Sequence, residues 1–274
     1  MKDEPRVILT AGFDRAPHVS ILAQALQQRG CRIEGLIVVS PYNWKRLRGL
    51  IRQRGGSFVR TAIPRLLGAD TEVAEEGTDD LAELMEEWGL RAGSLRAWAR
   101  KTNVTYRMVS SINAPEAVEL VREKQPDWVV YGGGGILREA VIDAARDRIL
   151  NAHSGPLPEI RGMNACEWSL LLGYPPTVTI HIINRGIDTG GVISTHPVPV
   201  RPRDTIETLR RRCVAMGVRA LLETVLHPPA SLPPPLQHAE QHRQCFVMAP
   251  AIKELLARRL AQGQYLSTSN TSTA

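Results

Sequence analysis

The sequence predicts an α/β fold in which a mostly parallel β-sheet carries helices on both of its faces. Short apolar runs of strand length alternate with longer segments whose apolar residues recur at helical spacing. Glycine and proline residues stand between these segments, where they end strands and begin or end helices. Strands and helices that alternate in this way are typical of a parallel sheet covered on both sides.

The first half of the chain carries most of this pattern. Val7–Thr10 is a short apolar strand, and Pro17 stands where the first turn of a helix tolerates proline. Gly30 is suited to end that helix, because glycine adopts the left-handed conformation without strain. Further strands are expected at 33–39, 104–109, 128–131 and 149–153, and further helices at 114–124 and 136–146.

One stretch, residues 41–100, interrupts the alternation. Residues 44–65 carry basic but no acidic residues, and residues 70–87 carry acidic but no basic residues. We interpret the two as an inserted helical lobe. Two solvated helix faces that attract each other explain the pattern more simply than a basic collar for a phosphorylated substrate, but the pattern fits both.

After residue 175 the pattern changes. Thr177–Ile183 alternates and is rich in β-branched residues, which is typical of a strand. A second strand is expected at 191–199, followed by a long amphipathic helix at 205–226. Pro-Pro steps then break the chain, a short helix is expected at 251–261, and the polar tail 267–274 is expected to be disordered. We therefore divide the chain into a main domain, 1–226, and a Pro-rich extension, 227–274.

The composition excludes several classes of protein. The 274 residues are 43% hydrophobic and 23% charged, with a net charge of +6, and contain no apolar run long enough to span a membrane. The polar start lacks the apolar region of a signal peptide, which predicts a cytoplasmic protein. Four dispersed cysteines predict reduced thiols and no structural zinc. The basic residues are not interleaved with aromatic ones, which argues against a nucleic-acid partner.

Four consecutive glycines, Gly132–Gly135, follow a predicted strand and precede a predicted helix. They match neither the dinucleotide-binding pattern GxGxxG nor a P-loop. They form either a tight turn or a backbone surface that a flat ligand can approach, because glycine has no Cβ.

Three polar residues near these glycines have the chemistry of a catalytic site. Asn151 and His153 alternate at the end of a predicted strand, so their side chains point to the same side, and Asp188 lies in a turn between two strands. Histidine exchanges protons near neutral pH, and a carboxylate stabilises its charged form. An asparagine amide can donate a hydrogen bond to an oxygen that gains negative charge.

The same region offers no obvious nucleophile. Cys166 lies among apolar residues, where we expect it to pack in the core, and no serine is placed to attack. We therefore expect direct group transfer through a tetrahedral intermediate. The histidine and aspartate also lack further ligands at metal spacing, so no metal is expected.

Three separated blocks resemble the folate-dependent formyltransferase family, which includes methionyl-tRNA, glycinamide ribonucleotide and sugar N-formyltransferases. The resemblance is close over 128–195 and loose over 7–226. It implies a Rossmann-like catalytic domain over 1–226 that includes the lobe 41–100. The blocks are Asn151-Ala-His153-Ser-Gly-Pro-Leu-Pro158-Glu-Ile-Arg-Gly162, Val178-Thr179 and Gly186-Ile-Asp188-Thr-Gly190.

The resemblance implies that Asn151, His153 and Asp188 are catalytic and that 10-formyltetrahydrofolate is the formyl donor. Arg161 would bind substrate phosphate, or else pack on the loop as a surface arginine. Gly155-Pro156 departs from the Ser-Leu of the family, which removes a hydroxyl and stiffens the loop. The folate contacts implied by the resemblance come from Gly135, Ile136, Leu137, Ile183, Gly186 and Ile187.

The resemblance leaves the acceptor amine to be chosen. The roughly 48 residues after Leu226 are too few for the β-rich second domain of a methionyl-tRNA formyltransferase. Glycinamide ribonucleotide formyltransferases usually lack an insertion such as 41–100. We expect a small amine, most simply a nucleotide-linked amino sugar whose phosphates meet the arginines of 45–65. The alternatives are a glycinamide ribonucleotide enzyme, a formyltetrahydrofolate hydrolase and a non-catalytic folate-binding protein, and a homodimer stays open.

Overall fold

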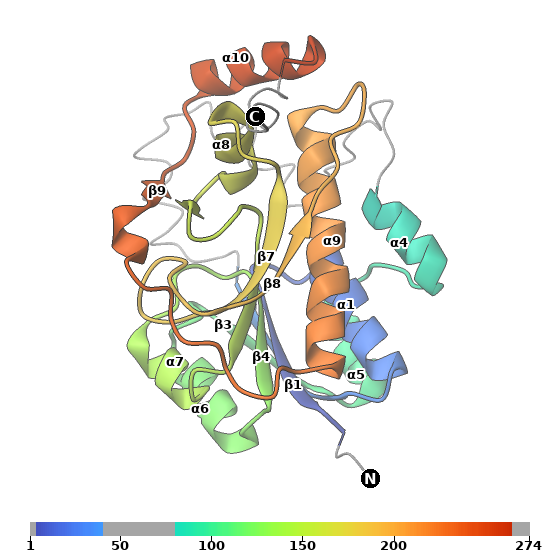
Figure 1. Cartoon of the computed structure of the whole chain (residues 1–274). Helices are drawn as coiled ribbons and strands as arrows, with labels where there is room; N and C mark the ends of the chain where they lie inside the picture. The colour runs from blue at the N-terminus through green and yellow to red at the C-terminus, as the bar shows by residue number, and fades with distance from the viewer. Residues whose placement is uncertain (1–3, 41–79, 265–274) are drawn as a thin grey trace, which may run out of the picture.

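The computed structural model describes residues 4–40 and 80–264, which form a layered α/β structure (Figure 1). A seven-stranded sheet has the order β3-β2-β1-β4-β5-β7-β8. Its first five strands are parallel, whereas β7 runs antiparallel to both β5 and β8. The predicted fold class, a mostly parallel and Rossmann-like sheet with helices on both faces, is confirmed. The strands of this sheet are β1 (Arg6–Ala11), β2 (Arg32–Val39), β3 (Thr105–Val109), β4 (Trp128–Gly132), β5 (Ile149–His153), β7 (Thr177–Ile182) and β8 (Val192–Pro197).

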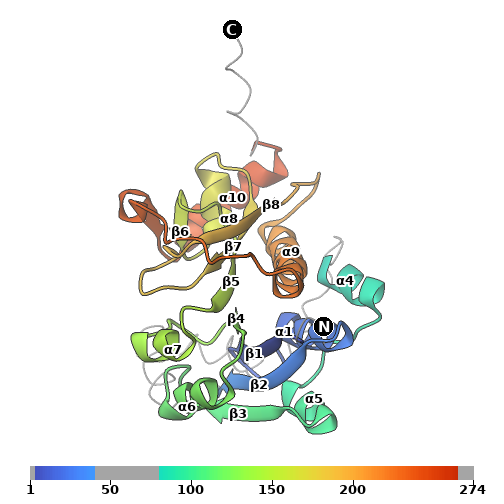
Figure 2. The same ribbon diagram turned by 60° about the horizontal axis from the view of Figure 1, so that its bottom comes forward.

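Helices cover the two faces of the sheet unequally. Figure 2 shows α1, α4 and α9 on one side and α6 and α7 on the other. Two short strands, β6 (Ile160–Gly162) and β9 (Arg243–Cys245), form a separate parallel pair. The helices are α1 (Pro17–Gln28), α4 (Asp80–Trp88), α5 (Leu95–Thr102), α6 (Pro115–Lys124), α7 (Glu139–Ala144), α8 (Ala165–Leu171), α9 (Ile206–Leu226) and α10 (Pro250–Ala261), with a 3-10 turn, η1, at Ala239–Gln241.

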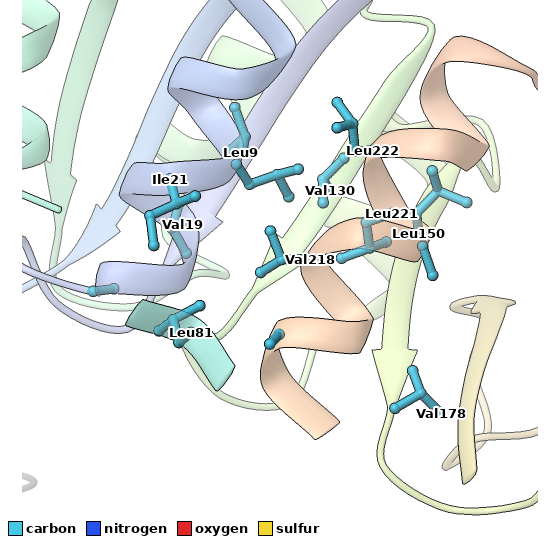
Figure 3. Packing of buried hydrophobic residues seen from close by; sticks show 14 of the residues in the cluster. Leu9, Val19, Ile21, Leu81, Val130, Leu150, Val178, Val218, Leu221 and Leu222 are labelled. Carbon is cyan, nitrogen blue, oxygen red and sulfur yellow. The ribbon is translucent and has the colours of Figure 1, made fainter. Parts of the chain in front are cut away.

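Two apolar clusters fill the space between the sheet and its helices. Along β1, Leu9 faces the cluster under α1 and α9, whereas Ile8 faces the cluster under α6 and α7. This alternation follows from the two-residue period of a strand. Figure 3 shows the larger cluster, in which Val19 comes from α1, Val218 from α9, and Leu9 and Val130 from β1 and β4 of the sheet. Burial on both faces explains why the central strands are apolar at nearly every position.

The strand order places a switch point between β1 and β4. From β1 the chain proceeds outward to β2 and β3 and then returns to β4 on the other side of β1. Ala11 and Gly132 are paired at the carboxyl ends of the two strands. In open α/β sheets, ligands bind outside the carboxyl ends of strands at such a point. The topology therefore indicates where a site should be sought.

The described part of the predicted lobe packs on the main core. Leu84 of α4 and Leu95 of α5 are buried in the same cluster as α1 and α9. Two acidic residues of α4 pair with arginines of α9: Asp80 Oδ1 lies 3.1 Å from Arg212 Nε, and Glu87 Oε1 accepts a 2.8 Å hydrogen bond from Arg219. Residues 41–79, with the basic segment 45–65, lie outside the described residues.

Some elements differ from the sequence prediction. The helix expected at 136–146 is only Glu139–Ala144, because Gly133, Gly134 and Gly135 have positive φ values of 116°, 128° and 105° and delay its start. The strands β6 and β9 were not predicted, because three-residue strands depend on their tertiary partner rather than on local pattern.

The C-terminal extension contacts the main domain along much of its described length. Leu256 and Leu260 of α10 are buried in the larger apolar cluster, and β9 pairs with β6. The tail 267–274 lies outside the described residues, so its expected disorder stays a prediction, as does the domain division.

The described residues include no helix that is both long and apolar enough to cross a membrane. The cytoplasmic location stays a prediction. All four cysteines are buried and free, and the sulfur atoms of Cys166 and Cys213 lie 3.8 Å apart.

Gly132→Ala is expected to lower the free energy of unfolding by about 1–3 kcal/mol through overpacking. An added Cβ would lie 2.3 Å from Val19 Cγ2 and 2.5 Å from the main-chain oxygen of Thr10, which cannot both move. Gly93→Ala is the matched control, because its Cβ meets nothing within 4 Å. Denaturant unfolding should leave the control within about 0.5 kcal/mol of wild type. Equal stabilities of the two variants would contradict this packing.

Candidate active site

Asn151, His153 and Asp188 are brought together where the sheet changes strand direction. Asn151 and His153 are at the carboxyl end of β5, and Asp188 lies in the loop between β7 and β8. The Nδ1 atom of His153 lies 3.5 Å from Asp188 Oδ2. Antiparallel pairing opposes Asn151 to His181 of β7, and His181 in turn lies beside Asp188. The residues singled out in the sequence therefore form one polar cluster.

His181 is a member of this cluster that the sequence analysis missed. Asn151 Nδ2 donates a 2.9 Å hydrogen bond to His181 Nε2, and His181 Nδ1 donates to the carbonyl of Ile182 at 2.9 Å. The ring is therefore neutral, with its proton on Nδ1. Burial lowers the pKa of His181 to about 4, although the nearby Asp188 carboxylate opposes this shift. The available signal was a lone histidine in a strand of otherwise β-branched and apolar residues.

His153 is buried and engaged through both ring nitrogens. It is 6% exposed, and its Nε2 donates a 2.8 Å hydrogen bond to the carbonyl oxygen of Ile160. Its Nδ1 faces the Asp188 carboxylate. Both neighbours are acceptors, so a doubly protonated ring satisfies both contacts. The arrangement is therefore suited to hold a positive charge next to Asn151.

Main-chain contacts fix the position of Asp188. Its Oδ2 accepts a 2.8 Å hydrogen bond from the N–H of Gly162, and its backbone adopts a left-handed φ of 50°. Both neighbouring histidines thus lie next to a carboxylate that the Gly162 N–H holds in one orientation.

Arg161 is placed differently from the expected phosphate-binding residue. Only 5% of Arg161 is exposed. Its guanidinium donates to the carbonyl oxygens of Ile187 at 3.1 Å and His242 at 3.0 Å. It therefore ties the loop next to Asp188 to the C-terminal segment. This geometry favours a role in positioning that loop over a role in binding substrate.

Gly155, which stands where the family has serine, leaves room for His153. A Cβ at this position would lie 3.1 Å from His153 Nε2 and 2.8 Å from the Cβ of Ala165. The carbonyl of Gly155 accepts a 2.7 Å hydrogen bond from the Thr179 hydroxyl, which holds the loop against β7. The departure from the family pattern is thus accommodated by close packing around the histidine.

The implied folate contacts lie in two segments that an arginine joins. Gly135 borders open space, Ile136 is 72% exposed, and the Leu137 side chain is buried in the core.

The loop that contains Ile183, Gly186 and Ile187 is connected to α7 by the Arg185 guanidinium. Its Nη2 lies 2.7 Å from Glu139 and 3.1 Å from Asp143. Gly132 is needed for tight packing, which fits a tight turn, whereas Gly135 presents open backbone, which fits a surface that a flat ligand can approach. Each interpretation of the glycines is therefore supported in part.

A cavity of about 250 Å³ opens at the switch point, between α1 and α9. Asn151 lines it, whereas His153 and Asp188 do not. Its walls are largely apolar, and no charged side chain is among the described residues that line it. The polar residues in its lining are Thr10, His18, Tyr131, Asn151 and Ser154. The cavity therefore offers an uncharged chamber beside the asparagine amide.

Among the described residues, no group of three or more histidine, cysteine, aspartate or glutamate side chains is placed to hold a metal ion.

Comparison with known proteins connects this site to one family. A family model described as formyl transferase matches residues 71–225, more than half of the chain. A methionyl-tRNA formyltransferase of Anaeromyxobacter sp. (strain K) is 32% identical over 138 residues, which cover 50% of this chain and 44% of that protein. A methionyl-tRNA formyltransferase of Koribacter versatilis is 31% identical over 157 residues, 56% of this chain and 46% of that protein. The chain thus spans about half the length of these curated relatives.

Solved structures share the fold at low sequence identity. Glycinamide ribonucleotide transformylase 1 from Symbiobacterium toebii superimposes with a TM-score of 0.55 at 20% identity, over 86% of this chain and 96% of that chain. A Mycobacterium tuberculosis protein described as a candidate sugar N-formyltransferase gives a TM-score of 0.52 at 16% identity, over 99% of this chain and 90% of that chain.

Gly155→Ala is expected to destabilise the protein by about 1–3 kcal/mol, because the new methyl group crowds His153 and Ala165. Ala165→Gly removes the nearest of the crowded atoms and should by itself lower the free energy of unfolding by up to about 1 kcal/mol. The double variant should be more stable than the sum of the two single changes predicts. Chemical denaturation of all four proteins measures this coupling, and strict additivity would count against the contact.

The free energy of unfolding should fall as pH drops from about 6.5 to about 4. The folded protein keeps His181 neutral down to its pKa of about 4, whereas the unfolded chain takes up a proton near 6.5. The unfolded state thus binds more protons in this window, and the His181 contribution approaches roughly 3 kcal/mol at its lower end.

Unfolding curves at several pH values measure this dependence. His181→Gln should have a shallower pH dependence over the same window, because glutamine does not titrate. His227→Gln, at an exposed position on the end of α9, is the matched control and should keep the wild-type slope. An unchanged slope in His181→Gln would show that another group causes the acid destabilisation.

Proposed function

The chain belongs to the formyl transferase family, and on this premise we propose that it moves the formyl group of 10-formyltetrahydrofolate to an amine. The observation that carries the proposal is the polar cluster beside the cavity, in which Asn151 is hydrogen-bonded to His181 and both His153 and His181 lie next to the Asp188 carboxylate. Its members hold and move charge around one point, which is what attack on a carbonyl carbon requires.

Asn151 is the proposed donor to the developing oxyanion. One N–H of its amide is directed to the neutral His181, which fixes the orientation of the amide plane. Among the described residues, no hydrogen bond from the second N–H of this amide is found, and we assign it to the formyl oxygen in the cavity that Asn151 lines. A preorganised donor of this kind typically contributes about 10²–10³-fold to the rate.

His153 and Asp188 are the proposed proton carriers. The acceptor amine forms a C–N bond with the formyl carbon and loses a proton, and the bond from the formyl carbon to the folate nitrogen breaks. The proton passes to that nitrogen by way of His153, whose charged form Asp188 stabilises. In this role the Nε2 atom of His153 exchanges its bond with the Ile160 carbonyl for one with the substrates.

The proposed folate site lies along the two segments joined by Arg185. The exposed Ile136 offers an apolar surface, and the main chain from Gly135 offers hydrogen-bonding groups without side-chain obstruction. The loop that contains Ile183, Gly186 and Ile187 would cover the other side of the flat ring. In this proposal Arg161 positions the loop and does not bind the substrate.

The proposed acceptor is a nucleotide-linked amino sugar. The cavity beside Asn151 has room for one sugar-sized group, and its apolar lining with a few polar side chains is typical of a small-molecule site. The nucleotide phosphates would meet the arginines of segment 45–65, which lie outside the described residues. The names of the relatives and of the structural neighbours supply the competing acceptors, methionyl-tRNA and glycinamide ribonucleotide.

Asn151→Ala and Asp188→Ala should each lower formyl transfer by at least about 100-fold while the protein remains folded, because both side chains serve the reacting centre. Glu119→Gln, on the exposed face of α6, is the control and should keep full activity. Mass spectrometry of the acceptor after incubation with 10-formyltetrahydrofolate measures the transfer. Wild-type rates in Asp188→Ala would contradict the mechanism.

A panel of acceptors tests the substrate. A UDP-linked 4-amino sugar, glycinamide ribonucleotide and methionyl-tRNA are each incubated with the wild-type protein and the formyl donor. Formylation of the sugar supports the proposal, and formylation of either other acceptor alone would replace the substrate but keep the chemistry. Release of formate at the same rate without any acceptor would favour a hydrolase.

A further inference from the structure

His18 lines the same cavity as Asn151, although it comes from a different layer of the fold. It lies in the first turn of α1, next to Pro17, at the carboxyl-end edge of β1 and β4. None of the family motifs identified in the sequence includes it. It is the histidine in the described lining of the cavity, whereas His153 and His181 lie in the buried cluster next to it.

A hydrogen bond to the glycine turn orients the His18 ring. Its Nε2 lies 3.0 Å from the main-chain oxygen of Gly132. A carbonyl oxygen only accepts, so Nε2 carries the proton. In the neutral ring the other nitrogen, Nδ1, then has a free lone pair. Within the described part of the chain, no hydrogen bond to His18 Nδ1 is found.

The surroundings keep this lone pair available. Burial lowers the pKa of His18 below its usual value, and the hydrogen bond to Gly132 only partly offsets the shift. The ring is therefore neutral at physiological pH, and Nδ1 acts as an acceptor rather than a donor.

We propose that His18 is a specificity-determining residue for the acceptor, whose amine-bearing end donates a hydrogen bond from an N–H or O–H to the Nδ1 of His18. This inference rests on the proposed function, because it places the acceptor in the cavity beside Asn151. His18 and Asn151 then contact the acceptor from α1 and β5, respectively. The pair orients the amine toward the position where the formyl group is held.

The rest of the lining defines the chemistry of the group that enters. Val19 and Leu22 of α1 face Val214 and Val218 of α9 across the cavity, and no described lining residue is charged. A charged group inside would lose its hydration without a partner, which is costly. The part of the acceptor inside is therefore uncharged and partly apolar, with at least one hydrogen-bond donor, and any phosphate lies outside.

Two substitutions separate the two nitrogens of His18. Glutamine places its amide near the position of Nε2, so His18→Gln keeps a donor to Gly132 and loses the acceptor at Nδ1. Asparagine places its amide oxygen near Nδ1, so His18→Asn keeps the acceptor and loses the bond to Gly132. His227→Gln is the control for a histidine-to-glutamine change at an exposed position.

The experiment measures steady-state kinetics of each variant with the UDP-linked 4-amino sugar, glycinamide ribonucleotide and methionyl-tRNA, together with 10-formyltetrahydrofolate. For the acceptor that the wild type uses, His18→Gln should raise the KM for that acceptor about 3- to 10-fold, the value of one neutral hydrogen bond. The KM for the formyl donor and the thermal midpoint should stay unchanged. His18→Asn should keep the wild-type KM for the acceptor despite a lower midpoint.

The outcomes separate this inference from the proposed function. An active wild type with an unchanged acceptor KM in His18→Gln overturns the role of His18 alone. An equal rise in the acceptor KM in His18→Asn and His18→Gln also overturns it. The weaker binding of the acceptor would then come from loss of the imidazole ring and not from loss of the acceptor at Nδ1. A wild type that formylates none of the three acceptors overturns the proposed function, and the His18 inference with it.

Discussion

The Asp188 carboxylate is held beside β5 by the main-chain N–H of Gly162, at 2.8 Å, and the rest of the site depends on that bond. Gly162 has a positive φ of 93°, and a Cβ there would lie 2.2 Å from the carbonyl oxygen of Cys245. Only glycine therefore fits at this position of β6, where the strand pairs with β9. The C-terminal strand thus presses against the residue that orients the aspartate, which connects a segment late in the chain to the centre of the site.

The same region is tied down at further points. The Leu236 N–H donates to the carbonyl of Thr189 at 3.0 Å, and Arg161 connects Ile187 to His242. These bonds flank Asp188 on both sides along the loop. Because the loop adopts a left-handed backbone at Asp188, such external support stabilises a conformation that it would seldom hold alone. The extension 227–261 therefore contributes to the geometry of the site.

Charge within the cluster is distributed unequally between two similar rings. His181 donates to a carbonyl and accepts from Asn151, so it is neutral, whereas both neighbours of His153 are acceptors. One carboxylate lies beside both rings, at 3.5 Å and 3.6 Å. The neutral ring orients the amide, and the other ring is suited to carry a proton. Two histidines of the same chemistry thus take different roles because their hydrogen-bond partners differ.

Local pattern was sufficient for the regular elements. Apart from the helix expected at 136–146, the strands and helices of the first half lie where apolar spacing, Pro17 and Gly30 placed them, because these signals act within a few residues. The motif residues Asn151, His153 and Asp188 were also recognisable, since they stand in the order and spacing of the family motif. Local pattern did not predict the short strands β6 and β9, because they depend on partners far along the chain. It also placed the start of α7 too early, because the glycines before that helix adopt positive φ values.

The sequence by itself determined the fold class, the family and the three motif residues, because periodicity and motif spacing are properties of the chain in one dimension. Tertiary structure alone decided which other polar residues join them. His181 and His18 stand as single polar residues in apolar patterns, and Arg161 could not be assigned to substrate or to loop. Antiparallel pairing with β5 places His181, the approach of α1 to Gly132 places His18, and a bond to the C-terminal segment places Arg161. Each of these placements depends on contacts between segments that are distant in the sequence.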